Sequence, residues 1–263
     1  MNKLVYGLGA GLIYSCGGKG TWKDRLPQIL NSFPNAVLVS TVDMPFNITK
    51  EISRIVGKDR LFLDSGGFTL YKNESKLSKE DHEKLCEKMK RKYLKMCSIA
   101  EYYQIFELDN EYFRKEEDLL SPKNFCREEV KEITGMYPTP VFKMHQGFQY
   151  WKDLCNSEMY PMLSIGGLAA TRAWHTHRDE LLKMMNYARQ KGKKVHLLGC
   201  QNVETFKMVR PNTVDYSIFQ YAINLAHARK EHPELDTYEE LKIHAALYAF
   251  ARAKSRSFLY DTF

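Results

Sequence analysis

The stretch Leu61-Phe62-Leu63-Asp64-Ser65-Gly66-Gly67-Phe68 joins a short apolar run to an acidic residue and two glycines. A short apolar run that ends at turn residues is typical of a buried β-strand. Glycines directly after such a strand allow the backbone to approach a flat ligand closely, because no side chain lies in the way. This stretch therefore predicts a strand that carries a functional carboxylate at its C-terminal end.

The same pattern of a short apolar run recurs along the whole chain. The predicted strands are Leu4–Leu8, Ala36–Thr41, Leu61–Asp64, Tyr102–Asp109, Val141–Met144, Met162–Ile165, Lys194–Leu198 and Val214–Phe219. Amphipathic segments lie between them, and those predicted as helices include Lys79–Ser98, Pro122–Thr134, Arg178–Lys191, Val203–Val209 and a closing helix at Thr237–Ala253. About eight alternating units predict an α/β fold of the (β/α)8 TIM-barrel type. A doubly wound open sheet has the same alternation and is the competing fold.

Composition narrows the class of protein. No linker or composition shift divides the 263 residues, so residues 1–263 are predicted to form one domain. No apolar run reaches the roughly 20 residues that span a bilayer, and no signal peptide begins the chain, so we expect a cytoplasmic protein with no membrane partner. Six scattered cysteines lack a C-x-x-C pair, which favours reduced, mostly buried thiols and predicts neither a metal site nor a disulfide framework.

The formal net charge of +7 fits a polyanionic partner such as nucleic acid, and ordinary solubility is the alternative explanation. The basic residues Arg172, His175 and Arg178 follow the sixth predicted strand, and we expect them at the mouth of a barrel, in contact with a nucleic-acid backbone. The glycines near the N-terminus match neither G-x-G-x-x-G nor a P-loop. No cofactor is predicted.

Barrel enzymes carry their chemistry at the C-terminal ends of the strands, and here those ends hold acids, an amide and glycines. They are Asp64, the segment Glu107–Glu111 with Asp109, Gln146, Gly166, Gly167 and Gly199, and Asp215 lies where the eighth predicted strand begins. Paired carboxylates suit glycosidic chemistry, because one can stabilise or attack the sugar carbon while the other moves a proton at the leaving base. Any single aspartate could equally cap a helix or pair with an arginine.

Four motifs, in this order, resemble the tRNA-guanine transglycosylase superfamily. Leu63–Phe68 is similar to its D-S-G-G-[FY]-Q motif and Gln146-Gly147 to its Q-G. Ser164–Ala169 is similar to A-L-G-G-L-A, and His196–Gly199 to Y-L-M-G. The motifs span most of the chain, and the resemblance implies a (β/α)8 barrel that breaks the bond between a nucleobase and its sugar.

The resemblance also implies a role for each matching residue. Asp64 would be the catalytic general acid and base, and Asp215 is the nearest candidate for the nucleophile. The implied base-binding residues are Phe68, Asp109, Gln146, Gly166, Gly167, Leu168 and Leu198.

The chain departs from the family pattern at three points. Thr69 stands where the glutamine of the first motif is expected. Counted without gaps from Gly199, the nucleophile falls near Ile218, three residues beyond Asp215. The C-x-C-x-x-C…H zinc site is absent. A zinc-free chain resembles the DNA 7-deazaguanine transglycosylases of phages and bacterial DNA-modification systems more than the tRNA enzymes.

These features give a first hypothesis and its alternatives. The first is exchange of guanine in DNA for a free 7-deazaguanine base, on a flipped-out or single-stranded nucleotide. A homodimer is the oligomeric state considered for such an enzyme. The second is a DNA glycosylase that uses water, leaves an abasic site and could act against phage DNA. A tRNA-guanine transglycosylase and an inactive nucleic-acid-binding subunit are the remaining alternatives.

Overall fold

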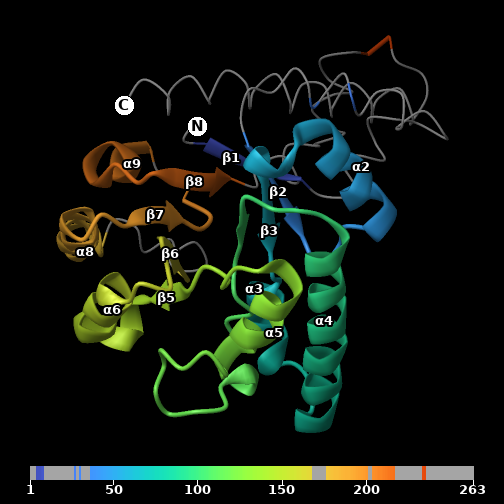
Figure 1. Ribbon diagram of the computed structural model, residues 1–263, viewed down its shortest axis with the longest axis horizontal. Coiled ribbons are helices and arrows are strands. Elements are labelled where there is room, and N and C mark those ends of the chain that lie inside the picture. The colour runs from blue at the N-terminus through green and yellow to red at the C-terminus, as the bar shows by residue number, and fades with distance from the viewer. Residues whose placement is uncertain are drawn as a thin grey trace.

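The computed structural model describes residues 4–8, 27, 30, 36–167, 176–200, 203–216 and 233–234. In these ranges the fold is α/β, with a parallel sheet and helices between successive strands (Figure 1). The strands are β1 (Leu4–Leu8), β2 (Ala36–Ser40), β3 (Leu61–Asp64), β4 (Gln104–Ile105), β5 (Val141–Lys143), β6 (Met162–Gly166), β7 (Lys194–Leu197) and β8 (Thr213–Tyr216). The predicted strand–helix alternation is therefore confirmed.

The eight strands follow the order β4-β3-β2-β1-β8-β7-β6-β5, and every recorded pair between them is parallel. The two strands at the ends of this order are also connected through their backbones. The Thr139 amide donates to the Ile105 carbonyl at 2.7 Å, and the Glu107 amide donates to the Thr139 carbonyl at 3.0 Å. A parallel bridge pairs Phe106 with Thr139 between these bonds.

The helices of the described part are α2 (Phe46–Val56), α3 (Gly67–Glu74), α4 (Lys79–Ile99), α5 (Arg127–Thr134), α6 (Gly147–Asn156), α8 (Arg178–Gln190) and α9 (Val203–Val209). Short 3-10 turns occur at η1 (Lys58–Arg60), η2 (Glu111–Phe113), η3 (Asn124–Cys126) and η4 (Met144–Gln146). In Figure 1, α2 and α4 lie on one side of the strands, and α6, α8 and α9 lie on the other. Helices therefore flank the strands on both sides of this view.

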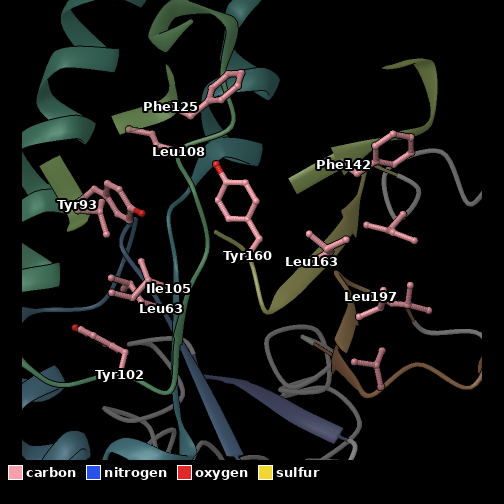
Figure 2. Close-up of a cluster of buried hydrophobic side chains, with 14 of the residues drawn as sticks. Leu63, Tyr93, Tyr102, Ile105, Leu108, Phe125, Phe142, Tyr160, Leu163 and Leu197 are labelled. Carbon is pink, nitrogen blue, oxygen red and sulfur yellow. The ribbon is translucent and has the colours of Figure 1, made fainter. Parts of the chain in front are cut away.

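Alternate residues of β2, β3 and β5 enter two separate cores. The larger core joins strand residues such as Leu63 and Leu197 to the buried faces of the helices (Figure 2). The smaller core lies on the opposite face of the strands and contains Ala36, Leu38, Phe62, Phe106 and Val141. This alternation follows from the two-residue period of a β-strand, and it leaves polar side chains of the same parity on the smaller face.

Two predicted elements are shorter than expected. The fourth strand covers only Gln104–Ile105 instead of Tyr102–Asp109, because the Asp109 and Asn110 amides turn back to the carbonyls of Glu107 and Leu108. The predicted helix at Pro122–Thr134 begins at Arg127 instead, because Phe125 and Cys126 adopt left-handed backbone conformations with φ of 56° and 60°. The predicted helix at Thr237–Ala253 and the end of the eighth predicted strand lie outside the described residues.

Five of the six cysteines, Cys86, Cys97, Cys126, Cys155 and Cys200, are described, and all five are buried and free of disulfide bonds. The prediction of buried thiols is confirmed for these five, and Cys16 lies outside the described residues. The prediction of a single domain is not tested by the fold.

Candidate functional site

Asp64 is the last residue of β3, and its backbone is fixed by the neighbouring strand. The Thr41 amide and hydroxyl both donate to the Asp64 carbonyl at 2.9 Å. Its partly buried carboxylate accepts from the Gly66 amide at 3.3 Å and from the Ser40 hydroxyl. Burial raises the pKa of Asp64 to about 6, the charge of Asp215 raises it further, and the bonds from Gly66 and Ser40 oppose the increase.

The two glycines after Asp64 each satisfy a local requirement. Gly66 has φ of 86°, a left-handed conformation that favours glycine, and a Cβ there would lie 2.7 Å from Val42 Cγ2. Gly67 begins α3, and a Cβ on it would lie 1.9 Å from Asp109 Oδ1. The missing side chain of Gly67 therefore makes room for the Asp109 carboxylate and allows the exits of β3 and β4 to meet.

Asp109 pairs with Lys143, the last residue of β5, which the sequence analysis did not select. Lys143 Nζ donates to the Asp109 carbonyl at 2.7 Å and lies 3.3 Å from the carboxylate oxygen Oδ2. Burial raises the pKa of Asp109 to about 7; Lys143 opposes this increase, and the charges of Glu107 and Asp64 add to it. A lysine that ends an otherwise apolar strand, Val141-Phe142-Lys143, was the available signal for this residue.

Gln146 uses one side of its amide within the backbone. Its Oε1 accepts from the Lys143 amide at 2.7 Å, in the turn η4 that follows β5. This bond leaves the amide nitrogen as the group of Gln146 that can donate to a ligand.

Asp215 lies within β8, and it is almost fully buried on the face of the strands that carries the smaller core. Its Oδ1 accepts from the Gly199 amide at 2.6 Å and lies 3.1 Å from His196 Nε2. The other ring nitrogen of His196 lies 2.8 Å from the Thr213 hydroxyl. Both of these contacts meet Oδ1, and no described residue donates to Oδ2, so Oδ2 is the oxygen that can face a reacting group.

His196 also connects distant strands. The ring of this fully buried histidine lies 5.9 Å from that of Phe62 on β3 and 4.8 Å from that of Phe106. From the sequence, His196 was expected only as part of a motif, and its contact with Asp215 was not predicted. Alternation along β7 was the available signal, because it puts His196 on the same face as the neighbouring acid.

The predicted residues around the sixth and seventh strands are partly described. Gly166 is buried, and a Cβ on it would lie 2.8 Å from Val141 Cγ1 and 3.2 Å from Leu198 Cδ1. Gly167 is exposed and has φ of 81°. Leu198 is partly buried against the smaller core. Leu168, Arg172 and His175 lie outside the described residues, whereas Arg178 is exposed at the first position of α8.

Phe68, the second residue of α3, has 47% of its surface exposed, and Lys72 Nζ lies 4.4 Å from the centre of its ring. The prediction that Phe68 and Leu198 sandwich a base is not tested by these positions. Within the described ranges, no group of three or more His, Cys, Asp or Glu side chains could hold a metal ion.

Glu107, in the segment after β4, is an acid with a structural role. Its Oε2 accepts from Arg127 Nε at 2.7 Å, and its Oε1 accepts from the Val141 amide at 2.8 Å. Both side chains are buried, with 3% and 0% of their surfaces exposed. Pairing with an arginine was the alternative considered for any single acid, and it applies to Glu107.

Comparison with known proteins gives a fold and no family. No family model matches the chain, and no curated protein sequence matches it. The X-ray crystal structure of the YdjI aldolase from Escherichia coli K12 is similar, with a TM-score of 0.54 and 8% identity over 98% of this chain and 90% of that one. At this identity the likeness shows a shared fold, in this case with an enzyme. Among the described residues, no helix is long and apolar enough to cross a membrane.

Proposed function

We propose that this chain is an enzyme that cleaves the N-glycosidic bond of a nucleotide in DNA and exchanges guanine for a free 7-deazaguanine base. The observation that carries the proposal is the position of Asp64. This carboxylate lies at the end of β3 with a pKa of about 6, and its charge is coupled to those of Asp215 and Asp109. A group with this pKa is present in both protonation states near neutral pH, as a general acid and base requires.

We also infer that the eight strands close into a (β/α)8 barrel. In an open sheet, β3 and β7 would be four strand spacings apart, about 19 Å. The rings of Phe62 and His196 on these strands lie 5.9 Å apart, and backbone bonds join the segments after β4 and before β5. Both observations support closure, which brings the strand ends that carry Asp64, Asp109 and Asp215 around one opening.

The proposed reaction has two steps. Asp215 Oδ2 forms a bond with the sugar C1′, the bond from C1′ to the base nitrogen breaks, and protonated Asp64 gives its proton to the leaving base. The incoming base nitrogen then attacks C1′ and loses a proton to Asp64, which releases Asp215. The bonds to Oδ1 from Gly199 and His196 support this role, because they hold the nucleophile in one orientation.

Recognition of the base is assigned to the side chains around these two acids. Asp109 has a pKa of about 7, so it can accept from or donate to a purine edge, and the amide nitrogen of Gln146 can donate. Phe68 and Leu198 would contact the faces of the ring, and Gly166, Gly167 and Leu168 its edge. A duplex base must leave the stack to reach such a site, so a flipped-out or single-stranded nucleotide is the proposed substrate.

The setting of the enzyme is part of the proposal. The five described cysteines form no disulfide bond, which is in keeping with a reducing compartment, and we assign the protein to the cytoplasm. The net charge of +7 supports a DNA partner, with Arg172, His175 and Arg178 in contact with the backbone. A homodimer stays a prediction.

The test is incubation of the purified protein with DNA that carries labelled guanine, with and without 7-cyano- or 7-aminomethyl-7-deazaguanine. Release of label that requires the free base, without abasic sites, is the expected result. Asp64→Asn and Asp215→Asn should each lower the rate at least about 100-fold. Asp59→Asn, at an exposed position in η1 at the opposite end of β3, is the matched control and should leave the rate unchanged.

Other outcomes select among the alternatives. Abasic sites formed without added base would mean that water is the acceptor and that the enzyme is a DNA glycosylase. Activity on tRNA alone would move the substrate to RNA. Binding of DNA without any chemistry, unchanged by Asp64→Asn, would contradict the enzymatic proposal and favour a nucleic-acid-binding subunit.

A further inference from the structure

One short segment of the described surface holds a concentration of exposed apolar side chains. Five large hydrophobic residues are exposed in the described part of the chain: Phe68, Tyr71, Leu77, Tyr112 and Ile133. Three of them fall within ten residues, on α3 and the turn after it. Single exposed apolar residues are ordinary on protein surfaces, whereas a group beside a candidate site indicates a binding surface.

Two of these residues are aromatic and share one face of α3. Phe68 and Tyr71 are three positions apart, and Lys72 is four positions from Phe68, so all three are neighbours on the helix surface. The exposed fractions of Phe68 and Tyr71 are 47% and 62%. The described residues contribute no ring contact and no hydrogen bond to Tyr71.

Two lysines, Lys72 and Lys76, follow the aromatic residues on α3 and just after it. Lys72 lies over one side of the Phe68 ring, and neither Lys72 nor Lys76 forms an ion pair with a described residue. Glu74 is the acid of α3, and it lies three positions after Tyr71 and four after the buried Leu70, so it borders this face. Aromatic rings interspersed with lysines are the combination that binds single-stranded nucleic acid, in which bases stack on the rings and phosphates pair with the cations.

The position of α3 fixes where such a strand would run. The helix begins at Gly67, three residues after Asp64, and its first residue meets the Asp109 carboxylate. A strand that lies along α3 therefore reaches the two acids at one end. In the proposed function, Phe68 contacts the target base, which leaves Tyr71 and Lys72 one turn further along the helix.

We propose that the exposed face of α3, formed by Phe68, Tyr71 and Lys72, binds the single-stranded nucleotides next to the target base. Tyr71 stacks on the neighbouring base, and Lys72 pairs with a phosphate. This inference rests on the proposed function for the direction of the strand. The binding surface itself can be tested without any chemistry.

The experiment measures the fluorescence anisotropy of a labelled single-stranded DNA oligonucleotide bound to the full chain in the Asp64→Asn background, which preserves the substrate. Tyr71→Leu should weaken binding at least about fivefold, and Tyr71→Phe should bind normally, because stacking requires a ring and no hydroxyl. Lys72→Ala should lower the dependence of log K on log salt by about 0.7, the loss of one phosphate contact on a single strand.

Lys183→Ala, an exposed lysine on α8, is the matched control and should change neither quantity. The inference is overturned if Tyr71→Leu and its parent bind the DNA with equal affinity, or if neither binds it. Capture of a protein partner by this face instead would also overturn it. If the wild type carries out the reaction but Tyr71→Leu binds DNA as tightly as its parent, the proposed function stands and this inference fails. If Tyr71→Leu weakens binding but the wild type shows no reaction, the binding surface stands and the proposed function fails.

Discussion

Two ion pairs differ sharply although their acids lie only two residues apart after β4: Glu107 with Arg127, and Asp109 with Lys143. Glu107 and Arg127 are buried, and Arg127 also donates to the carbonyls of Leu119 and Ser121 at 2.6 and 3.2 Å. Asp109 and Lys143 keep 17% and 25% of their side-chain surfaces exposed. The first pair has its hydrogen-bonding groups engaged within the protein, and the second remains open to a ligand.

The difference separates a structural acid from a candidate functional one. Glu107 links the exit of β4 to the Val141 amide of β5, so its charge supports the connection between those two strands. Asp109 has a pKa of about 7 and is coupled to Asp64, so its protonation changes near neutral pH. Perturbed titration together with access is the combination found at functional sites.

The largest expected effect comes from breaking the structural pair. Arg127→Met would leave the Glu107 charge buried without its partner, which should lower the free energy of unfolding by about 3–5 kcal/mol. Urea denaturation measures this change. Arg54→Met removes an exposed pair with Glu51 and, as the matched control, should cost less than about 1 kcal/mol.

A second substitution sharpens the result. Adding Glu107→Gln to Arg127→Met removes the unpaired charge and should restore part of the lost stability. If Arg127→Met costs no more than Arg54→Met, the buried pair does not have the structural role assigned to it.

An intermediate effect is expected where the start of α3 meets the segment after β4. In Gly67→Ala, the new Cβ would lie 1.9 Å from Asp109 Oδ1, so the carboxylate or α3 must move. We expect a loss of about 1–3 kcal/mol in unfolding free energy, measured by urea denaturation. Combining Gly67→Ala with Asp109→Ala removes the atoms that clash, so the alanine should cost less in that background. An equal cost in both backgrounds would show that Gly67 is not needed for Asp109.

Much of the fold follows from local sequence patterns. Each predicted strand has a counterpart because an apolar run between polar segments is a local signal, and the helix at Val203–Val209 matches its prediction. The fourth strand was overestimated because Phe106–Leu108 is apolar enough to continue a strand. Backbone turns at Asp109 and Asn110 and the Glu107–Arg127 pair end it instead, and that pair joins residues 20 apart in sequence.

Asp64 was expected at a strand end because a motif and a strand end coincide there, and it is the last residue of β3. Asp109 was expected at the end of the fourth strand and lies four residues beyond it. Contacts that a side chain makes with a partner on another strand were not predicted. In the sequence, Lys143 stands out only as a charge at the end of an apolar strand and His196 only as part of a motif. Their contacts with Asp109 and Asp215 arise only when the strands are side by side. Charge pairing across strands has no local signature in a single sequence.

The smallest effect, and the one that tests the second pair, is the dependence of stability on pH. The folded pKa of Asp109, about 7, lies above the unfolded value of about 3.9, so its contribution to stability is fully present below the unfolded pKa and is lost as pH rises through the folded pKa. Lys143→Met removes the cation that opposes the raised pKa of Asp109, so ionisation of the Asp109 carboxyl becomes less favourable.

The loss of stability caused by Lys143→Met should therefore be small near pH 5, where Asp109 is protonated, and larger by about 1 kcal/mol near pH 8.5, where it must ionise without the cation. Urea denaturation at the two pH values measures this difference, with Lys183→Met as the exposed control. A loss that is the same at both pH values would mean that Lys143 only supports the backbone through the Asp109 carbonyl. In that case the second pair would be structural, like the first, and Asp64 and Asp215 would remain as the acids available for chemistry.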